Sequence, residues 1–388
     1  MLLENLLLLT DFFPPGYRSG GPARSCYNLS LGLSQLHPIK VLTRDTDLGA
    51  PLPYPNIQPD TWTDFASGVS VCYCSPKKQR FRSILRRMRD SKATVFYLNS
   101  MFSLPFTIYP LLAYWLGFIQ GRVVLAPRGM LKASALQYKP LKKRLFLALF
   151  RGLGWHKRII FQATNTEEAQ DIQRVFGAAA QLQICPPVPE LGLLRQRVEH
   201  IKAAAGVRLC MLGRIHPIKN IDLGLELLAD LYPAPVLVDV IGPFEDAAYY
   251  THCQAIAAAL PDSIRVVFHG ALPTVAARGI LQQADFFYLL TQGENFGHAI
   301  FEALALGKPA LISDQTPWRN LRARRIGWDL ALDDLSGIRA ALREAVDMDF
   351  GTYQDWSDAA HRHARELVAE SDWEAGYLGL FGYRPPSE

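Results

Sequence analysis

The chain has 388 residues, which is enough for two domains that each bury a sizeable core. Its 49% hydrophobic and 20% charged residues indicate a globular protein and exclude an intrinsically disordered one. The formal net charge of +5 conceals an asymmetry: residues 1–190 carry 23 Lys and Arg against 11 Asp and Glu, a net +12, whereas the remainder carries 18 against 25, a net −7. A basic N-terminal half favours anionic partners such as phospholipid or a pyrophosphate-linked lipid, and no nucleic-acid motif accompanies it.

The cysteines and the N-terminus indicate the compartment. Of the six cysteines only Cys72 and Cys74 lie close together, and no second pair completes a zinc site. Free thiols in a reducing compartment are therefore expected. The first ten residues are apolar but contain Glu4 and no basic residue, which predicts a first buried strand rather than a signal peptide.

Residues 93–121 carry no charge over a length that can cross a bilayer. They contain Asn99, Pro105 and Pro110 and begin with a strand-like run. We therefore expect a buried strand, loop and helix there, with a transmembrane helix as the alternative.

Strands alternate with helices along the chain, and most strands end at a glycine or proline turn. Short apolar runs predict strands at residues 6–9, 39–43, 94–98, 123–126, 159–164, 207–212, 236–241, 264–268, 284–290 and 310–313. Amphipathic or capped segments predict helices at residues 23–36, 75–89, 139–155, 221–231 and 372–381 and after Thr164, while residues 45–70 are predicted to be loop and turn. This alternation predicts an α/β fold with parallel sheets and ligands at the carboxyl edge of the strands.

Three local signals refine this organisation. Thr164, with Glu167 three residues later, predicts a capping box at a helix start. The proline-rich run Ile184-Cys-Pro-Pro-Val-Pro189 predicts a stiff linker between two domains. The pair Gly20-Gly21 after the first strand lets backbone approach a ligand closely, with a plain tight turn as the alternative.

Two predicted helices are strongly basic. Residues 75–89 and 139–155 interleave lysines and arginines with apolar side chains. This pattern suits an anionic membrane surface, whereas the alternative is the solvated face of an ordinary helix.

Residues 293–307 read G-E-N-F-G-H-A-I-F-E-A-L-A-L-G and predict a loop followed by a short helix between two buried strands. The loop carries Glu294 and the helix carries Glu302, and the unbonded N–H groups at the helix start form an anion site. Two carboxylates flanking such a site suit a ligand with hydroxyls at both ends and phosphate in the middle, which is the layout of a sugar nucleotide. The alternative is an ordinary capped helix with solvated glutamates.

The E-x7-E spacing of Glu294 and Glu302 resembles the donor site of the retaining glycosyltransferase family 4, which has the GT-B fold. Residues 213–220, which read G-R-I-H-P-I-K-N, resemble the family's G-R-x4-K-[NG] segment. The two motifs lie about as far apart as in that family, and the resemblance spans nearly the whole chain.

The resemblance implies two Rossmann-like domains whose parallel sheets face each other across a cleft. The expected divisions are an acceptor-binding domain at residues 1–188, a donor-binding domain at residues 189–370 and a C-terminal helix at residues 371–388 that crosses back to the first domain.

The resemblance also implies roles for individual residues. Arg214 and Lys219 would hold the donor diphosphate, Glu294 would face the donor sugar, and Glu302 would bind the ribose hydroxyls, which makes Arg214, Lys219 and Glu294 the catalytic candidates. The other donor-binding candidates lie in the glycine turns and at the helix start: Gly20, Gly21, Gly213, Asn295, Phe296, Gly297 and His298. Arg128 stands where a subset of bacterial polysaccharide transferases has the same P-R-G-M-L segment, which makes it an acceptor- or phosphate-facing candidate, with a structural salt bridge as the alternative.

Two fixed cations can take the place of a divalent metal, because they stabilise the charge that develops on the leaving diphosphate. No D-x-D motif appears where a metal-dependent transferase would need it. We therefore expect no metal and no cofactor beside the nucleotide-sugar donor.

The expected function is that of a retaining hexosyltransferase that uses a UDP- or GDP-linked sugar. Its acceptor would be a membrane-associated saccharide or lipid-linked acceptor in bacterial cell-surface polysaccharide or lipopolysaccharide biosynthesis. The expected location is cytoplasmic and peripheral, at the inner face of an anionic membrane. The alternatives are a GT-B enzyme that makes a soluble glycoside of the sucrose or trehalose type, a sugar-nucleotide epimerase, and a non-catalytic sugar-nucleotide binding protein.

Overall fold

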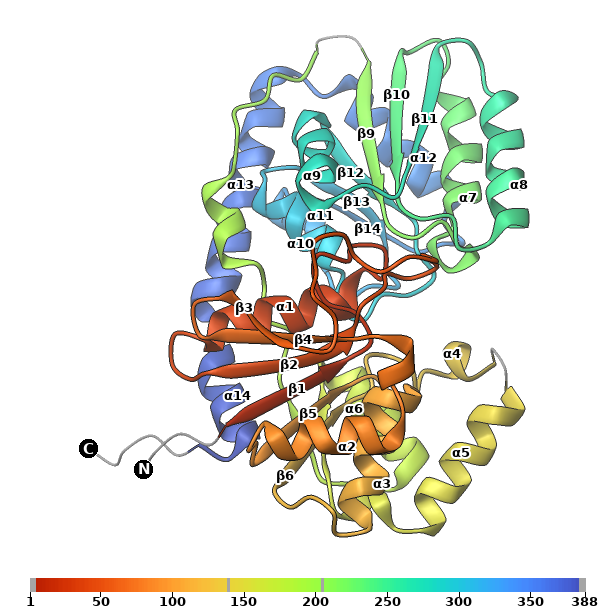
Figure 1. The fold of residues 1–388 in the computed structure, drawn as a ribbon. Coiled ribbons are helices and arrows are strands. Elements are labelled where there is room, and N and C mark those ends of the chain that lie inside the picture. Colours follow the sequence, from red (N-terminus) through yellow and green to blue (C-terminus); the bar gives the residue numbers. More distant parts are fainter. Residues whose placement is uncertain (1–4, 138–139, 204–205, 384–388) are drawn as a thin grey trace. The chain divides into compact units, whose positions relative to one another are not determined.

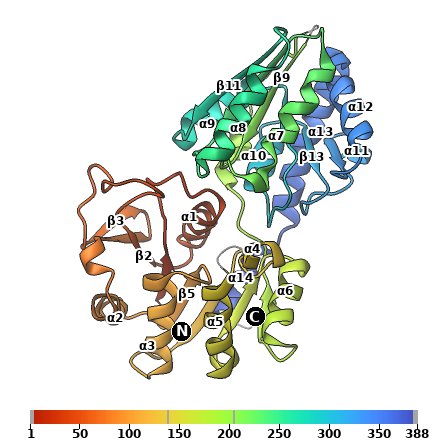
Figure 2. The ribbon, with the colours of Figure 1, turned by 90° about the vertical axis from the view of Figure 1, so that its right-hand side faces the viewer.

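The computed structural model describes residues 5–137, 140–203 and 206–383 of the chain (Figures 1 and 2). The chain divides into two compact α/β units. Unit 1 contains the residues up to Val188 together with those from Asp372 onward, and unit 2 contains Pro189–Ser371.

Unit 1 is built on an eight-stranded sheet of order β3-β4-β2-β1-β5-β6-β7-β8. Its strands are β1 (Leu6–Thr10), β2 (Ile39–Arg44), β3 (Trp62–Ala66), β4 (Val69–Cys74), β5 (Val95–Asn99), β6 (Arg122–Ala126), β7 (Ile160–Ala163) and β8 (Leu182–Ile184). Every pairing is parallel except the antiparallel pairing of β3 with β4 at one edge.

Helices cover both faces of this sheet, so successive residues of β1 enter two different cores. Leu6 and Leu8 pack into the core beneath α1 (Gly21–Leu33) and α14 (Trp373–Phe381), whereas Leu7 and Leu9 pack into the opposite core. The helices on that opposite face are α2 (Phe81–Asp90), α3 (Tyr109–Trp115), α5 (Pro140–Gly152) and α6 (Thr166–Phe176). Shorter helical segments complete the unit: η1 (Pro76–Lys78), η2 (Leu104–Ile108), α4 (Ala133–Gln137) and η3 (Trp155–Lys157).

Three predictions for unit 1 need correction or lie partly outside the described residues. Residues 45–70 are not all loop, because β3 and the first residues of β4 lie there; β3 is a half-exposed edge strand, and such a strand lacks a continuous apolar run. The N-cap of α6 is Asn165 rather than Thr164, since the Asn165 side chain accepts a hydrogen bond from the Glu168 amide at 2.8 Å. The predicted basic helix begins at Pro140, and Lys139 lies outside the described residues.

The uncharged segment 93–121 folds as β5, η2 and α3. No helix among the described residues is long and apolar enough to span a bilayer. The transmembrane alternative for this segment is therefore wrong.

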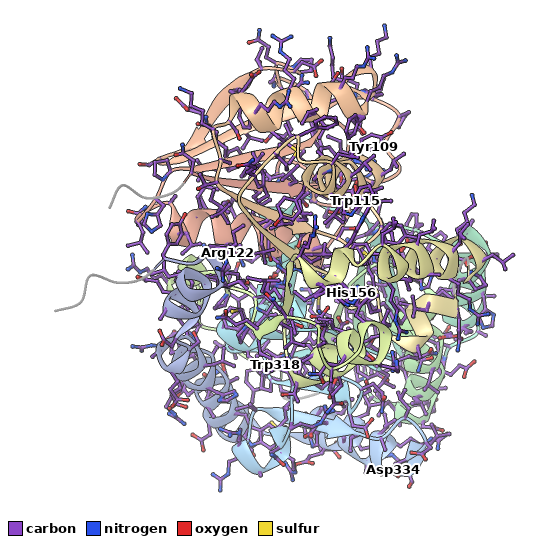
Figure 3. The ribbon with its side chains drawn as sticks, turned by 90° about the horizontal axis from the view of Figure 1, so that it is seen from below. Tyr109, Trp115, Arg122, His156, Trp318 and Asp334 are labelled. Carbon is purple, nitrogen blue, oxygen red and sulfur yellow. The ribbon has the colours of Figure 1, made fainter. Side chains whose placement is uncertain are left out.

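The C-terminal helix α14 belongs to unit 1. Its residues Tyr377, Leu380 and Phe381 are fully buried in the core beneath α1. Arg122 lies at the start of β6 (Figure 3). Its side chain donates the Nε–H to the Leu380 carbonyl of α14 at 2.7 Å.

Unit 2 has a six-stranded, fully parallel sheet of order β11-β10-β9-β12-β13-β14. Its strands are β9 (Val207–Leu212), β10 (Val236–Ile241), β11 (Ile264–Gly270), β12 (Phe286–Leu289), β13 (Ala310–Ser313) and β14 (Gly327–Leu330). Its helical elements are η4 (Leu191–Arg195), η5 (Pro217–Lys219), α7 (Ile221–Glu226), η6 (Leu227–Leu231), α8 (Ala247–Ala258), α9 (Thr274–Gln283), α10 (His298–Ala305), α11 (Leu321–Arg324), α12 (Leu335–Asp347) and α13 (Phe350–Glu370). The carboxyl ends of β9, β12 and β13 therefore lie next to one another and position the loops described below.

Candidate functional site

The candidate site lies at the carboxyl edge of the unit 2 sheet, where the loops after β9, β12 and β13 meet. Two hydrogen bonds join the first two loops, because the Ile218 carbonyl accepts from the Gln292 amide at 2.8 Å and from the Thr291 hydroxyl at 3.0 Å. The Glu294 amide donates to the Gln315 carbonyl at 3.0 Å, which joins the second loop to the third. The two sequence motifs are thus held together by backbone groups.

A glycine allows the strand ends to approach closely. Gly242, after β10, has φ +154°, and a Cβ atom there would lie 1.8 Å from the Gly213 carbonyl oxygen. Gly213 in turn donates its amide to the Ile241 carbonyl at 2.9 Å. Only glycine at position 242 allows this turn, which fixes where the G-R motif leaves the sheet.

The segment that presents Lys219 is a single 3-10 turn, η5. His216 caps this turn, since its Nδ1 accepts a hydrogen bond from the Ile218 amide at 3.2 Å. Asn220 follows with φ +53° and starts α7. The stem of Lys219 crosses the backbone of Gly213, where a Cβ atom would lie 3.5 Å from Lys219 Cε. The side chain is therefore directed back over the end of β9.

Lys219 and Glu294 form an ion pair. Their side chains are only 13% and 16% exposed, so little water screens the pair. The two residues are 75 positions apart in the chain and come from the two separate motifs. The structure thus brings together the predicted diphosphate-binding lysine and the predicted sugar-facing glutamate.

Arg214 makes a different contact. Its Nη1 lies 2.5 Å from Glu245 Oε2, and the two side chains are 38% and 36% exposed. Glu245 lies in the loop after β10, so the predicted second cation is engaged on the side of that loop rather than with Glu294.

A glycine stands at the N-cap of α10, where a larger residue would not fit. Gly297 is the N-cap with φ +78°, and a Cβ atom there would lie 2.9 Å from Ile300 Cδ1 and 3.1 Å from Trp318 Nε1. Trp318 donates its indole N–H to the Phe296 carbonyl at 2.7 Å, which fixes the preceding loop. Because glycine supplies no side-chain cap, the positive end of the helix dipole is left for another acceptor.

The remaining donor candidates surround this helix start. The rings of Phe296 and His298 meet edge to face with centroids 4.8 Å apart, and both residues are partly exposed, as is Asn295. Glu302 lies one turn into α10 and is only 3% exposed, so its carboxylate is not solvated in the way the alternative of an ordinary surface helix assumes.

Gly20, Gly21 and Arg128 belong to unit 1. Gly20 is the N-cap of α1 with φ +70°, and Gly21 is the first residue of that helix. Arg128 donates from Nε to Asn99 Oδ1 at 2.7 Å and from Nη2 to the Tyr97 hydroxyl at 2.5 Å. These bonds give Arg128 a structural role with uncharged partners in place of the salt bridge considered above, while its acceptor-facing role stays a prediction.

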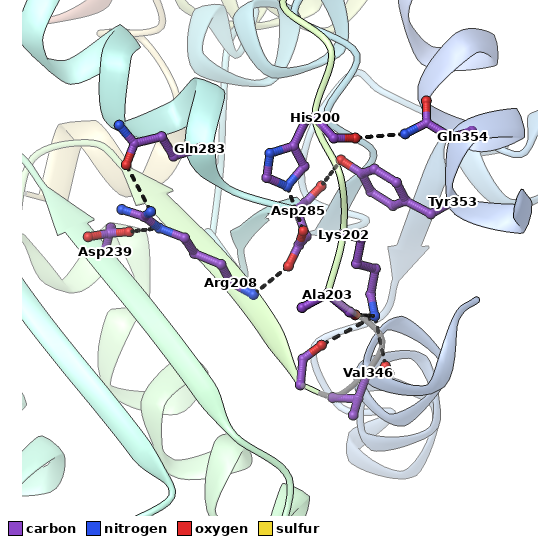
Figure 4. A network of polar contacts seen from close by, with 11 residues as sticks. His200, Lys202, Ala203, Arg208, Asp239, Gln283, Asp285, Val346, Tyr353 and Gln354 are labelled. Carbon is purple, nitrogen blue, oxygen red and sulfur yellow. Dashed lines mark hydrogen bonds and ion pairs between the residues drawn. The ribbon is translucent and has the colours of Figure 1, made fainter. Parts of the chain in front are cut away.

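A second polar network in unit 2 starts at the opposite, amino ends of β9 and β12 (Figure 4). Asp285, just before β12, accepts from the Arg208 amide at 2.7 Å and pairs with His200 at 2.7 Å. Arg208 also pairs with Asp239 at 2.8 Å, and Asp239 contacts His269 at 2.7 Å. The network extends through the middle of β10 to His269 near the carboxyl end of β11, and its charges satisfy one another, so we assign them to stability.

Four residues of the site were not predicted from the sequence. Glu245, Thr291, Gln315 and Trp318 pair with Arg214 or join the loops. The signal that could have found Thr291 is a small polar residue directly after a buried strand. Among the described residues no group of three or more His, Cys, Asp or Glu side chains is placed to hold a metal ion.

Comparison with known proteins links this geometry to a family. Residues 195–321 match the family model described as glycosyl transferases group 1, and this segment contains Arg214, Lys219, Glu294 and Glu302. A GDP-mannose:cellobiosyl-diphosphopolyprenol alpha-mannosyltransferase of Komagataeibacter xylinus is 33% identical over 126 residues, which are 29% of this chain and 32% of that protein. The match thus spans about a third of the relative.

Solved structures match over nearly the whole chain. Sucrose-phosphate synthase from Thermosynechococcus elongatus has a TM-score of 0.68 at 16% identity, with 97% of each chain covered. Anabaena HepE in complex with UDP and glucose has a TM-score of 0.68 at 13% identity, covering 97% of this chain and 100% of that one. WaaG, a glycosyltransferase involved in lipopolysaccharide biosynthesis, has a TM-score of 0.60 at 14% identity, with 97% and 98% covered.

The family match covers the part of unit 2 that contains both sequence motifs, and the similar structures extend over both units. The chain has the GT-B fold, and its unit 2 carries the segment that is typical of glycosyl transferases group 1.

Proposed function

We propose that this chain is a retaining hexosyltransferase that moves a sugar from a nucleotide-diphosphate sugar to a lipid-linked saccharide acceptor. The observation that carries the proposal is the contact between Lys219 and Glu294 at the carboxyl edge of the sheet, beside the uncapped start of α10. It places a cation, a carboxylate and a helix N-terminus in one region of unit 2, as a ligand with a diphosphate and a sugar requires.

In the proposed chemistry the two cations exchange their carboxylate partners for the donor diphosphate. Lys219 and Arg214 each hold a carboxylate, Glu294 and Glu245 respectively. A bound diphosphate would compete for both cations, and the charge that develops on it during transfer would strengthen these contacts. Exchange would also release Glu294 toward the donor sugar, whereas Glu302 would serve the ribose hydroxyls from α10.

The donor and acceptor are proposed from the name of the mannosyltransferase relative. That protein is named for a GDP-mannose donor and a sugar linked through diphosphate to polyprenol. We extend a GDP-linked donor and a lipid-diphosphate acceptor to this chain, with a UDP-linked sugar as the competing donor. The route would be bacterial cell-surface polysaccharide or lipopolysaccharide assembly, at the cytoplasmic face of an anionic membrane. The sucrose and trehalose enzymes among the similar structures share the fold at 10–16% identity, and none of them adds a sequence match of the kind that supports a lipid-linked acceptor.

A thermal-shift screen tests the donor site. Guanosine, uridine and adenosine diphosphates and their sugars should be compared for the wild type and for Lys219→Ala. A ligand at 100 times its dissociation constant adds about 2.7 kcal/mol to the free energy of unfolding, which is readily detected. The wild type should respond to one nucleotide series and the variant much less. A wild type that responds to no nucleotide would overturn the proposal.

Metal independence is part of the same proposal, since two fixed cations would stabilise the leaving diphosphate. Transfer should persist in EDTA at the rate measured with Mg²⁺ or Mn²⁺ present. Loss of transfer in EDTA that either metal restores would contradict a metal-independent site.

A further inference from the structure

Helix α5 has an apolar outer face. Leu141, Leu145 and Leu149 are spaced four residues apart and are 81%, 64% and 55% exposed. Such a spacing places all three on one side of the helix. The opposite side is the one that packs on the unit 1 core, through Leu147 and Phe150, which are 9% and 1% exposed. The three exposed leucines therefore take no part in packing the helix onto unit 1, which is done by Leu147 and Phe150.

Basic side chains flank this leucine stripe. On a helix of 100° per residue, Lys142 lies on one side of the stripe, and Arg144 and Arg151 lie on the other. All three are exposed. An apolar centre with cations on both borders is the pattern of a helix that lies in a membrane interface.

The stretch of sequence that contains α5 carries no acidic residue. Residues 91–166 contain 11 Lys and Arg and no Asp or Glu. A protein partner usually offers a mixture of both charges, whereas an anionic bilayer offers acyl chains below one sign of charge. The exposed leucines of α5 thus complement the acyl chains of a bilayer, and the basic residues around them complement its anionic headgroups.

Further exposed apolar residues lie at the same end of unit 1. The helices α3 and α5 are side by side there in both ribbon views (Figures 1 and 2), and the Trp115 and Trp155 rings are 5.9 Å apart. Trp115, Leu116 and Phe118 are 38%, 46% and 44% exposed. Aromatic rings at this position suit the headgroup level of a membrane.

The other basic helix, α2, has a different character. Its apolar residues Ile84 and Met88 are buried in the core. Arg87 pairs with Asp60 at 2.8 Å, and Arg86 lies 3.6 Å from Asp90. Arg89 donates to the Phe118 carbonyl at 3.2 Å, and Arg82 is exposed. Helix α2 thus presents basic residues but no exposed apolar stripe, which fits the solvated face of an ordinary helix, whereas α5 does not.

We propose that α5 is a membrane-docking helix whose leucine stripe, Leu141, Leu145 and Leu149, enters the interface of an anionic bilayer while Lys142, Arg144 and Arg151 contact the headgroups. The proposal deepens the proposed function, because it names the surface by which the enzyme reaches a lipid-linked acceptor, but docking itself requires no turnover. It is measured without any sugar nucleotide.

Sedimentation with vesicles of phosphatidylglycerol and phosphatidylcholine tests the stripe. The triple variant Leu141→Gln, Leu145→Gln, Leu149→Gln should bind these vesicles at least tenfold more weakly, because each leucine loses most of its transfer free energy. The control is Leu52→Gln with Val275→Gln, which introduces glutamine at two apolar residues that are 73% and 81% exposed and lie outside α5. This control should bind like the wild type.

Charge variants separate the two basic helices. Lys142→Gln with Arg144→Gln should weaken binding to anionic vesicles and flatten its salt dependence, whereas Arg82→Gln with Arg86→Gln on α2 should change it little. If the α2 pair removes binding and the α5 pair does not, α5 is not the docking helix.

A fluorescent label reports insertion directly. All six native cysteines are buried, so Leu145→Cys can be labelled selectively with an environment-sensitive dye. The emission should shift to the blue on adding vesicles, and a label at Val275→Cys should not respond. An unshifted dye at residue 145 on bound protein would refute insertion of the stripe.

Two further results would be decisive. Self-association that the leucine variant abolishes, with vesicle binding unchanged, would assign the stripe to an interface between copies and overturn the proposal. Nucleotide binding, measured by titration without vesicles, should be the same in all variants. Its absence in the wild type would reject the proposed function and leave the docking result standing.

Discussion

Lys219 and Arg214 show how position within a loop decides the environment of a predicted cation. Lys219 lies on the short turn η5 and is drawn over Gly213 into a shielded pair, whereas Arg214 lies at the strand end and reaches a more exposed glutamate. Loss of a cation that stabilises a leaving group typically costs on the order of 10²–10³ in rate.

We expect Lys219→Ala and Arg214→Ala each to lower kcat strongly in a transfer assay, while circular dichroism and the melting temperature show an intact fold. Glu245→Gln is the matched control, because it removes the partner of Arg214 but leaves the cation, and its kcat should fall far less. Near wild-type turnover in either alanine variant would remove that cation from the diphosphate site.

The two glutamates should have separable roles. Glu302→Ala is expected to weaken both the free nucleotide and the nucleotide sugar, because it is proposed to contact the ribose. Glu294→Ala should weaken the nucleotide sugar more than the free nucleotide. Isothermal titration with both ligands measures this, and equal losses for both ligands in both variants would exclude the division of roles.

Lys308 gives a pH-dependent prediction. It is 1% exposed, no described group lies within hydrogen-bond distance of its Nζ, and burial lowers its pKa to about 7. Between that pH and the ordinary lysine pKa the unfolded chain binds the proton and the folded chain does not, so this residue makes the free energy of unfolding rise with pH. Relative to Lys308→Met, the wild type should gain roughly 2 kcal/mol between pH 7 and pH 9.

Chemical denaturation at both pH values measures this difference. Lys157→Met, at an exposed lysine, should follow the wild type. A parallel pH dependence of the wild type and Lys308→Met would show that Lys308 is not buried as a neutral amine.

At the scale of elements, buried strands were predicted with correct bounds, whereas a half-exposed strand was missed. The strands β9, β10 and β13 have the predicted bounds because each is a nearly continuous apolar run in a sheet covered on both faces. The edge strand β3 was not predicted, because it carries Asp64 and is half-exposed and so has no continuous apolar run. The helix predicted at residues 221–231 divides into α7 and η6, and nothing in its composition marks that change.

The motif residues were predictable because their spacing is local, whereas their partners were not. The contact of Glu245 with Arg214 depends on how β10 lies beside β9, and the bond from Trp318 depends on the order of β12 and β13. Such contacts depend on the order of the strands in the sheet, and that order cannot be read from a single sequence.

Helix α14 supplies a prediction at this scale. The Tyr377 hydroxyl accepts from Gln162 Nε2 at 2.8 Å, and Gln162 also donates to the Cys185 carbonyl at 2.6 Å. Tyr377→Phe leaves a buried amide short of a partner and should cost about 1–2 kcal/mol in the free energy of unfolding of unit 1. Tyr232→Phe, at a side chain that is 66% exposed, is the control for urea denaturation and should be neutral.

On the scale of the whole molecule, each unit has its own hydrophobic cores, two in unit 1 and two in unit 2. Length alone predicted two domains, and the proline run at residues 184–189 predicted a linker, which is the stretch where the residues of unit 1 give way to those of unit 2. Multi-domain proteins need not unfold in one step.

Calorimetry should therefore resolve two unfolding transitions. The nucleotide that binds should raise only the transition of unit 2, because a ligand stabilises only what it binds. Lys308→Met should move that same transition, and Tyr377→Phe should move the other one. A single transition that shifts as a whole with nucleotide and with both variants would show that the units unfold together.

The return of α14 to unit 1 bears on synthesis by the ribosome. Unit 2 is one uninterrupted stretch and can close its cores as soon as it has emerged, whereas the core beneath α1 lacks Tyr377, Leu380 and Phe381 until the chain beyond unit 2 has been made. The half of the protein that is made first should therefore be the half that matures last. A stalled or shortened nascent chain would carry a finished unit 2 and an unfinished, basic unit 1.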